Sequence, residues 1–268
     1  MKVKYNRPMT IAAGFCCMDG VLLGTDTLVT DGCTKTYENK VFECSQFGSY
    51  PLVLMAGAGV FPRIKEFADR LLTENTFTDS DTGEDVKHAL RKAIDSAWYR
   101  ESVRMTNESG YNLDFIFAIK DLEGGTSLLH LCNADLYPIH QYCCVGNGAP
   151  IAKYLAAWLY SQSLPVEMFA ILAMHIFREA KEYSDGCGGE TRLQPLFNGF
   201  DDVDRPHIDT QDTAFLWGLY AHLKPLIYAC INTKAPDPIF DNHVYRFEHY
   251  VRSLHSKAKS GYLPDNSL

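Results

Sequence analysis

Short apolar runs separated by turn residues open the chain, and they restrict it to a fold that contains β-sheet. The first two runs flank the dipeptide Asp19-Gly20, which is a strong signal for a tight hairpin. The last run ends at a Gly57-Ala58-Gly59 segment that breaks the pattern. We therefore expect four consecutive β-strands, at residues 11–17, 21–30, 40–43 and 51–56.

After Gly59 the apolar residues repeat at the spacing of a helix. Two such segments, 60–72 and 86–97, are joined by a polar connection, and strand-like runs follow them. The pattern predicts further strands at 114–119, 127–132 and 139–145, and then helices at 150–159 and 165–182. Strands, two helices, strands and two helices form an α+β order. It indicates two sheets packed face to face, with a helix pair on each outer side.

The pattern is weaker beyond Gly189. We expect one more strand within 192–200, a helix-like segment at 213–231 and an amphipathic segment at 243–255. The predicted organisation is a leader or tail at 1–9, a single domain at 10–200, and a helical extension at 201–268 that packs on the same domain.

Composition excludes several classes of function. Hydrophobic residues make up 46% of the chain and charged residues 22%, which is typical of a globular protein with a large core. The net charge is −8 and Lys and Arg are not clustered, so we expect no nucleic-acid partner. No apolar run reaches the length of a membrane span, about 18 residues, and residues 1–8 lack the apolar core of a signal peptide. We expect a cytoplasmic protein without a membrane partner.

Motifs for metals and cofactors are missing from the sequence. The nine cysteines include no Cys-x-x-Cys, so we interpret them as reduced thiols that pack as small hydrophobes. His130, Cys132 and His140 lie in predicted strands, but no third ligand has a recognisable spacing, and we expect them to be packed or surface residues. Neither a dinucleotide-binding nor a phosphate-binding glycine motif is present, so we expect no cofactor.

The order of elements, with the residues between them, resembles the proteasome β-subunit and HslV peptidases of the N-terminal-nucleophile hydrolases. The similarity covers roughly residues 10–200. It rests on Thr10-Ile11, Gly24-Thr25-Asp26, Lys40-Val41, Ala56-Gly57, Gly146-Asn147-Gly148, Asp185 and Gly188-Gly189. The resemblance implies a four-layer αββα sandwich of two antiparallel sheets, assembled into rings around a proteolytic chamber.

The resemblance also implies a chemistry. Thr10 would be the nucleophile, with its own free α-amine as the general base. The ammonium of Lys40, paired with Asp26, would lower the pKa of that amine. The backbone N–H of Gly57 would bind the developing oxyanion. Thr10 and Asp26 are sixteen residues apart, which equals the spacing in the family. Lys35 competes with Lys40 for the cationic role, and each residue also has an ordinary structural interpretation.

Three positions depart from the family pattern. Asn147 and Gly188 stand where serines are usual; Asn147 can still hydrogen-bond, and Asp185 at the matching aspartate site could keep part of that network. Met9 stands where processed subunits have glycine. Our hypothesis is that translation begins at Met9, or that the short leader is trimmed, so that Thr10 becomes the N-terminus.

The sequence therefore predicts a threonine-type endopeptidase that assembles as a homo-oligomeric ring and cleaves polypeptides without a metal or cofactor. An ATP-dependent unfoldase is a possible partner. Two alternatives stay open: a non-catalytic ring or scaffold subunit in which Thr10 is blocked, and an amidase that acts on small amides.

Overall fold

The computed structural model describes residues 10–31, 34–44, 52–73, 87–92, 94–95, 114–132, 135–199 and 237–259. The chain divides into two compact units, Met1–Arg205 and Pro206–Leu268. In the second unit the described element is helix α6 (Asp237–Lys259), which contains the amphipathic segment expected at 243–255. The helix-like segment expected at 213–231 lies outside the described residues. The domain limits at residues 9 and 200 and the packing of the extension stay predictions.

Four strands of the first unit form an antiparallel sheet in the order β10-β1-β2-β11, which we call the first sheet. Strands β1 (Ile11–Cys17) and β2 (Gly20–Asp26) are joined across Asp19, and Cys17 pairs with Gly20, so the predicted hairpin is confirmed. Strand β11 (Thr191–Phe197) pairs with β2, and β10 (Tyr142–Gly146) pairs with β1.

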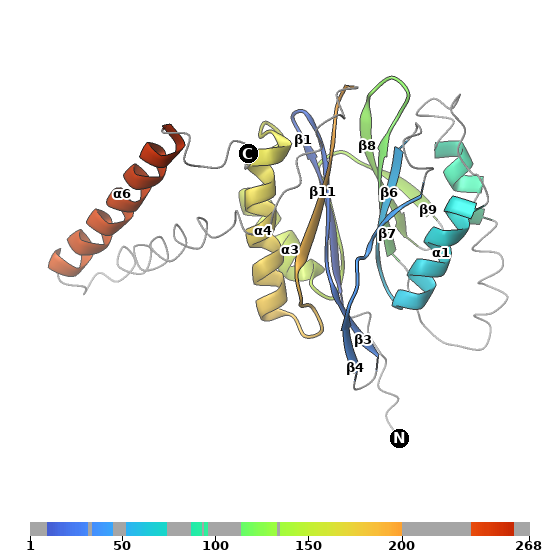
Figure 1. The fold of residues 1–268 in the computed structure, drawn as a ribbon, viewed down its shortest axis with the longest axis horizontal. Coiled ribbons are helices and arrows are strands. Elements are labelled where there is room, and N and C mark those ends of the chain that lie inside the picture. Colours follow the sequence, from blue (N-terminus) through green and yellow to red (C-terminus); the bar gives the residue numbers. More distant parts are fainter. Residues whose placement is uncertain are drawn as a thin grey trace. The chain divides into compact units, whose positions relative to one another are not determined.

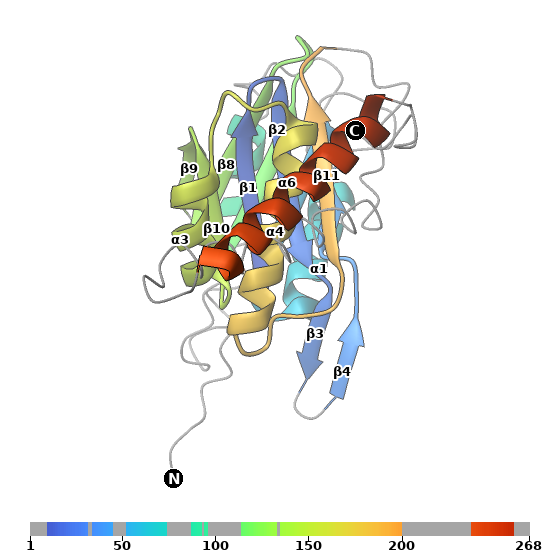
Figure 2. The ribbon, with the colours of Figure 1, turned by 90° about the vertical axis from the view of Figure 1, so that its left-hand side faces the viewer.

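The single strand expected at 21–30 is wrong, because the chain breaks at Thr27. Both the N–H and the hydroxyl of Thr27 bond to the backbone of Glu190, so this residue leaves the ladder between β1 and β2. The chain then forms a separate two-stranded hairpin of β3 (Leu28–Asp31) and β4 (Thr34–Tyr37). Figure 2 shows this hairpin extending beyond the end of the first sheet.

Five strands form the second sheet, which is antiparallel throughout, in the order β5-β6-β7-β8-β9. Its members are β5 (Val41–Glu43), β6 (Leu52–Ala58), β7 (Asp114–Lys120), β8 (Thr126–Cys132) and β9 (Asp135–Ile139). Strand β6 continues through Gly57 to Ala58, so the predicted break comes two residues later, at Gly59.

The strand expected at 139–145 is also wrong. The chain turns at His140 and Gln141, which separates β9 in the second sheet from β10 in the first. Apolar residues flank the turn on both sides, so two polar residues, His140 and Gln141, are its only mark in the sequence. No glycine marks the position where the chain crosses from one sheet to the other.

Helices cover the outer faces of the two sheets, as Figure 1 shows. Helix α1 (Phe61–Thr73) lies against β5 and β6, and residues 87–92 and 94–95 are also helical; the rest of the helix expected at 86–97 lies outside the described residues. Helices α3 (Ala149–Leu159) and α4 (Val166–Tyr183) lie against the first sheet. The α+β fold with four αββα layers is therefore confirmed.

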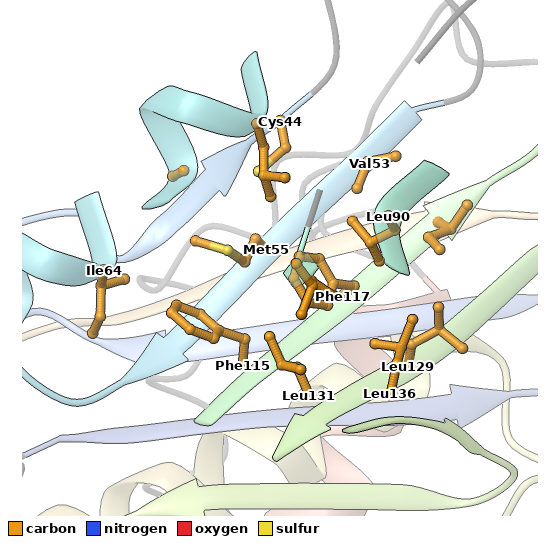
Figure 3. Close-up of a cluster of buried hydrophobic side chains, with 14 residues drawn as sticks. Cys44, Val53, Met55, Ile64, Leu90, Phe115, Phe117, Leu129, Leu131 and Leu136 are labelled. Carbon is orange, nitrogen blue, oxygen red and sulfur yellow. The ribbon is translucent and has the colours of Figure 1, made fainter. Parts of the chain in front are cut away.

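Two hydrophobic clusters hold these layers together. One lies between the sheets and includes Leu23, Ile116 and Val145. The other lies between the second sheet and its helices; Figure 3 shows Phe115 and Phe117 at its centre. Burying a side chain of this size contributes about 1.5–3 kcal/mol, so the clusters stabilise the strand ends that carry the candidate site.

Two further expectations concern the whole chain. None of the helices that the structure describes is long and apolar enough to cross a membrane. The cysteines that it describes are free thiols, namely Cys16, Cys17, Cys44, Cys132, Cys143, Cys144 and Cys187.

Candidate active site

Three of the predicted site residues meet where strand ends converge in the first unit. Thr10 precedes β1, Asp26 ends β2 and Lys40 precedes β5. The Lys40 Nζ donates to Thr10 Oγ1 at 2.6 Å and to Asp26 Oδ1 at 2.8 Å, and Thr10 Oγ1 donates to Asp26 Oδ1 at 2.5 Å. All three residues are buried, with exposed fractions of 2%, 0% and 2%. We call this set the threonine cluster.

Both charges of the threonine cluster are fully hydrogen-bonded. Besides Thr10 and Lys40, Asp26 accepts from the backbone N–H of Ile11 at 3.2 Å and of Gly188 at 2.9 Å. Lys40 also donates to the backbone carbonyl of Leu28 at 2.5 Å. A buried ion pair is tolerated only when further hydrogen bonds compensate for the lost water, and here the backbone supplies them.

Two opposing effects act on the pKa of the Lys40 ammonium. Burial lowers the pKa of Lys40, and the nearby Asp26 carboxylate opposes that shift. Lys35, the alternative cation, lies exposed in β4. The geometry therefore favours Lys40 over Lys35 as the cation next to Thr10.

The backbone of Thr10 is fixed by the turn after β10. The N–H of Gly148 donates to the Thr10 carbonyl at 3.3 Å. Gly146 has φ of +91°, and a Cβ there would come within 2.3 Å of that same carbonyl oxygen. Only glycine fits this position, because a side chain would be strained by the backbone angle and would also collide with Thr10.

Asn147 and Asp185 meet each other rather than the threonine cluster. The Asn147 Nδ2 donates to the backbone carbonyl of Asp185 at 2.5 Å, which links the turn after β10 to the turn after α4. Asp185 is exposed. Within the described part of the chain, no hydrogen bond joins either side chain to Thr10.

Gly57 lies inside β6, where it pairs with Phe115. A side chain at this position would point toward Phe115 and Ile64, which belong to the cluster between the second sheet and its helices. The neighbouring Ala58 lies close to the turn that holds Thr10. A Cβ added to Gly146 would come within 3.1 Å of the Ala58 Cβ and within 2.3 Å of the Thr10 carbonyl oxygen. The oxyanion role of Gly57 stays a prediction.

Sequence reasoning missed the backbone groups that complete the threonine cluster. From the sequence we considered Gly188 as a motif residue and for the serine hydroxyl it lacks, whereas its N–H is a direct donor to Asp26. The Leu28 carbonyl was also missed. Cys187 lies near the same charges, and burial raises the pKa of its thiol to about 12. The glycines within 186–189 could have indicated the Gly188 contact, since they mark a turn whose backbone can approach other groups closely.

A second group of ionisable side chains lies between β7 and β8, and it could hold a metal. Asp114, His130 and Cys132 offer ligand atoms that all lie within 4.8 Å of one another. The Asp114 carboxylate raises the pKa of His130 to about 9, and the Cys143 thiol acts in the same direction. We expected His130 and Cys132 to be packed or surface residues, and that expectation left out Asp114. The strand register places Asp114 beside Cys132.

The fold has relatives among solved structures. The helical assembly of the Anbu complex from Pseudomonas aeruginosa matches with a TM-score of 0.66 at 14% identity, over 85% of this chain and 98% of the other. Anbu (ancestral beta-subunit) from Yersinia bercovieri matches with a TM-score of 0.67 at 12% identity, over the same shares. No protein-family model and no curated protein matches the sequence.

These matches correct the resemblance drawn from the motifs. Its assignment to the proteasome β-subunit and HslV peptidases is wrong, because the matched structures are Anbu proteins, which are distinct from HslV. The motifs misled because they mark the strand ends and turns of a shared architecture, and such positions do not separate one family from another. At this identity the matches show the fold alone. The chain has a proteasome-like fold of the Anbu type.

Proposed function

We propose that the chain is a threonine-type peptidase with Thr10 as its nucleophile. The observation that carries this proposal is the 2.6 Å hydrogen bond from the Lys40 ammonium to the Thr10 hydroxyl, beside the Asp26 carboxylate. A strand threonine that serves only packing needs no buried ion pair next to its hydroxyl, and burying such a pair carries a desolvation penalty.

The reaction requires a base for the hydroxyl proton, and the α-amine of Thr10 supplies one once the bond to Met9 is broken. The Thr10 Oγ1 attacks the carbonyl carbon of the substrate amide while its proton passes to that amine. The proton then moves to the leaving nitrogen as the C–N bond breaks, and water hydrolyses the ester that remains. Lys40 lowers the pKa of the amine, and Asp26 holds Lys40 in place.

The other predicted residues have supporting roles in this proposal. The backbone N–H of Gly57 stabilises the oxyanion. Asn147, through its hydrogen bond to the Asp185 carbonyl, holds together the two turns from which Gly148 and Gly188 reach the threonine cluster.

We also propose that the protein is a cytoplasmic homo-oligomer that acts on polypeptides, with an ATP-dependent unfoldase as a possible partner. One solved neighbour is described as a helical assembly, so an open helical arrangement stands beside the closed ring expected from the motifs. Negative-stain electron microscopy of the purified protein distinguishes the two.

A non-catalytic scaffold subunit is the second candidate function. It is favoured by the amide bond between Met9 and Thr10 in the full chain and by the 2% exposure of Thr10. A small-molecule amidase is the third, and a panel of peptides and acyl amides separates it from a peptidase.

The test is hydrolysis of fluorogenic peptides by a chain that begins at Thr10, compared with the full chain. We expect turnover by the chain that begins at Thr10, retained turnover in Thr10→Ser, and complete loss in Thr10→Ala. Hydrolysis that persists in Thr10→Ala would contradict the mechanism. Inactivity of a folded chain with a free Thr10 amine would favour the scaffold.

A further inference from the structure

The strand register of the second sheet brings metal-ligand side chains together from distant parts of the sequence. Asp114 at the start of β7 pairs with Cys132 at the end of β8, and His130 pairs with Ile116. Residues two apart on a strand point to the same face, so His130 and Cys132 lie on one face of β8. Ile116 belongs to the cluster between the two sheets, which places this face toward the first sheet. We call Asp114, His130 and Cys132 the β7–β8 cluster.

The β7–β8 cluster has an unsatisfied imidazole nitrogen. The Nε2 atom of His130 is shielded from solvent and has no hydrogen-bond partner among the described residues. The Asp114 Oδ1 lies 3.6 Å from it, which is beyond hydrogen-bond distance. A buried polar atom without a hydrogen bond is rare and costs free energy, and an ion at this position would supply the missing contact.

The distances in the β7–β8 cluster suit a small ion. A tetrahedral zinc ion that binds a nitrogen and an oxygen at about 2.0–2.2 Å separates those two atoms by about 3.3–3.5 Å. The separation of 3.6 Å between His130 Nε2 and Asp114 Oδ1 is close to this range. The three ligand atoms lie within 4.8 Å of one another, so small side-chain rotations would close the set.

Cys143, in the first sheet, is the candidate for a fourth ligand beside this set of three. Cys143 in β10 packs against the cluster between the sheets, and it pairs with Gly14, which faces Ile116. Its thiol also acts to raise the pKa of His130. All four residues are partly buried, which leaves a path for an ion and still protects it from bulk water.

We propose that Asp114, His130, Cys132 and Cys143 form a zinc site that links the two sheets. Thiolate and imidazole ligands favour zinc over magnesium or calcium, which prefer oxygen ligands. Four protein ligands make a closed, structural site rather than a catalytic one, because no position is left for a substrate.

The site would also connect to the threonine cluster through the backbone. Asp114 pairs with Ala58, which lies next to Gly146 and the Thr10 carbonyl. Cys143 lies in the same strand as Gly146, whose turn holds that carbonyl. An ion that joins β7 and β8 to β10 would fix the strand from which this turn begins.

The experiment measures zinc binding by the full chain after chelator treatment under reducing conditions, with a competing chromogenic chelator as the readout. We expect one zinc ion to be lost at least tenfold more readily from Cys132→Ser, His130→Gln and Asp114→Asn. The matched controls are Cys16→Ser, another partly buried strand cysteine, and His140→Gln, an exposed histidine of the neighbouring turn. Both controls should bind as the wild type does.

Cobalt provides a second readout, and its measurement on the wild-type chain does not depend on how any variant folds. Co²⁺ in the wild-type chain should give the thiolate-to-metal charge-transfer absorption of a tetrahedral site, and this absorption should weaken in Cys143→Ser. A wild-type chain that binds no stoichiometric zinc and gives no such absorption overturns the proposal. If the control variants lose zinc as readily as the ligand variants, the assigned ligands are wrong. If the cobalt absorption of Cys143→Ser equals that of the wild type, Cys143 is not the fourth ligand.

Discussion

The two ionisable clusters of the first unit differ in how completely their polar atoms are satisfied. In the threonine cluster the Asp26 carboxylate receives four hydrogen bonds, and the nearby Lys40 donates three. In the β7–β8 cluster the Nε2 of His130 has no hydrogen-bond partner within the described part of the chain, and the Asp114 carboxylate lies 3.6 Å from it. The threonine cluster has all its hydrogen bonds within this chain, which fits a site that acts on a substrate. The β7–β8 cluster is a set of ligand atoms with one hydrogen bond missing, which fits a site that binds an added ion.

Breaking the threonine cluster should have the largest effect on stability. Asp26→Ala leaves the Lys40 ammonium buried without its counter-ion, which we expect to lower the free energy of unfolding by about 3–5 kcal/mol. Urea denaturation measures this change. The matched control is Asp185→Ala, which removes an exposed carboxylate and should change stability by less than about 0.5 kcal/mol. Equal effects of the two substitutions would show that Asp26 is not held by a buried pair.

Lys40 and Lys35 offer a sharper test of the chemistry. In a chain that begins at Thr10, we expect Lys40→Met to slow peptide hydrolysis by at least about 100-fold, since the cation that tunes the base is lost. Lys35→Met should keep the wild-type rate, because Lys35 is exposed in β4. Steady-state kinetics on folded protein decides between them; a loss in Lys35→Met alone would reverse the assignment.

Zinc should stabilise only a chain with an intact β7–β8 cluster. At a free zinc concentration about 100-fold above its dissociation constant, binding adds about 2.7 kcal/mol to the free energy of unfolding. The melting temperature of the wild type should therefore rise on adding zinc and fall on adding chelator, whereas that of Cys132→Ser should not respond. The same rise in both proteins would place the ion elsewhere.

The smallest expected effect is a dependence of stability on pH that comes from Lys40. Burial lowers its pKa below 10.5, so between the two values the unfolded chain holds more of this proton than the folded chain. Stability therefore increases as pH rises through that window, by at most about 1.4 kcal/mol per pH unit. Relative to Lys40→Met, the wild type should gain stability as the pH rises toward 10.5, as measured by chemical denaturation. If the wild type instead loses stability relative to Lys40→Met over this pH range, the pKa of Lys40 is raised in the folded chain and not lowered.

The sequence was informative where a residue type has one structural meaning. Asp19-Gly20 predicted its hairpin, and helical spacing predicted α1, α3 and α4. It failed at two breaks between strands. The turn at 140–141 is marked only by two polar residues between apolar ones. The break at Thr27 depends on hydrogen bonds to Glu190, which is far away in the sequence.

The same division holds for the candidate site. Thr10, Asp26 and Lys40 were proposed together because the resemblance to the N-terminal-nucleophile hydrolases implied it, and the structure brings the three side chains into contact. The N–H of Gly188 and the carbonyl of Leu28 were not, since every residue carries such groups and only the fold decides which ones point at a charge. Asp114 was missed as a partner of His130 and Cys132 because cross-strand register, not sequence spacing, sets that contact.

Covalent labelling of Thr10 tests the central claim most directly. A peptide epoxyketone needs both a hydroxyl and a free α-amine on one residue, and intact-mass measurement followed by peptide mapping locates its adduct. We predict one adduct, at Thr10, in a chain that begins at Thr10, and none in a chain that retains residues 1–9 or in Thr10→Ala. A folded chain with a free Thr10 amine that forms no adduct would contradict the account.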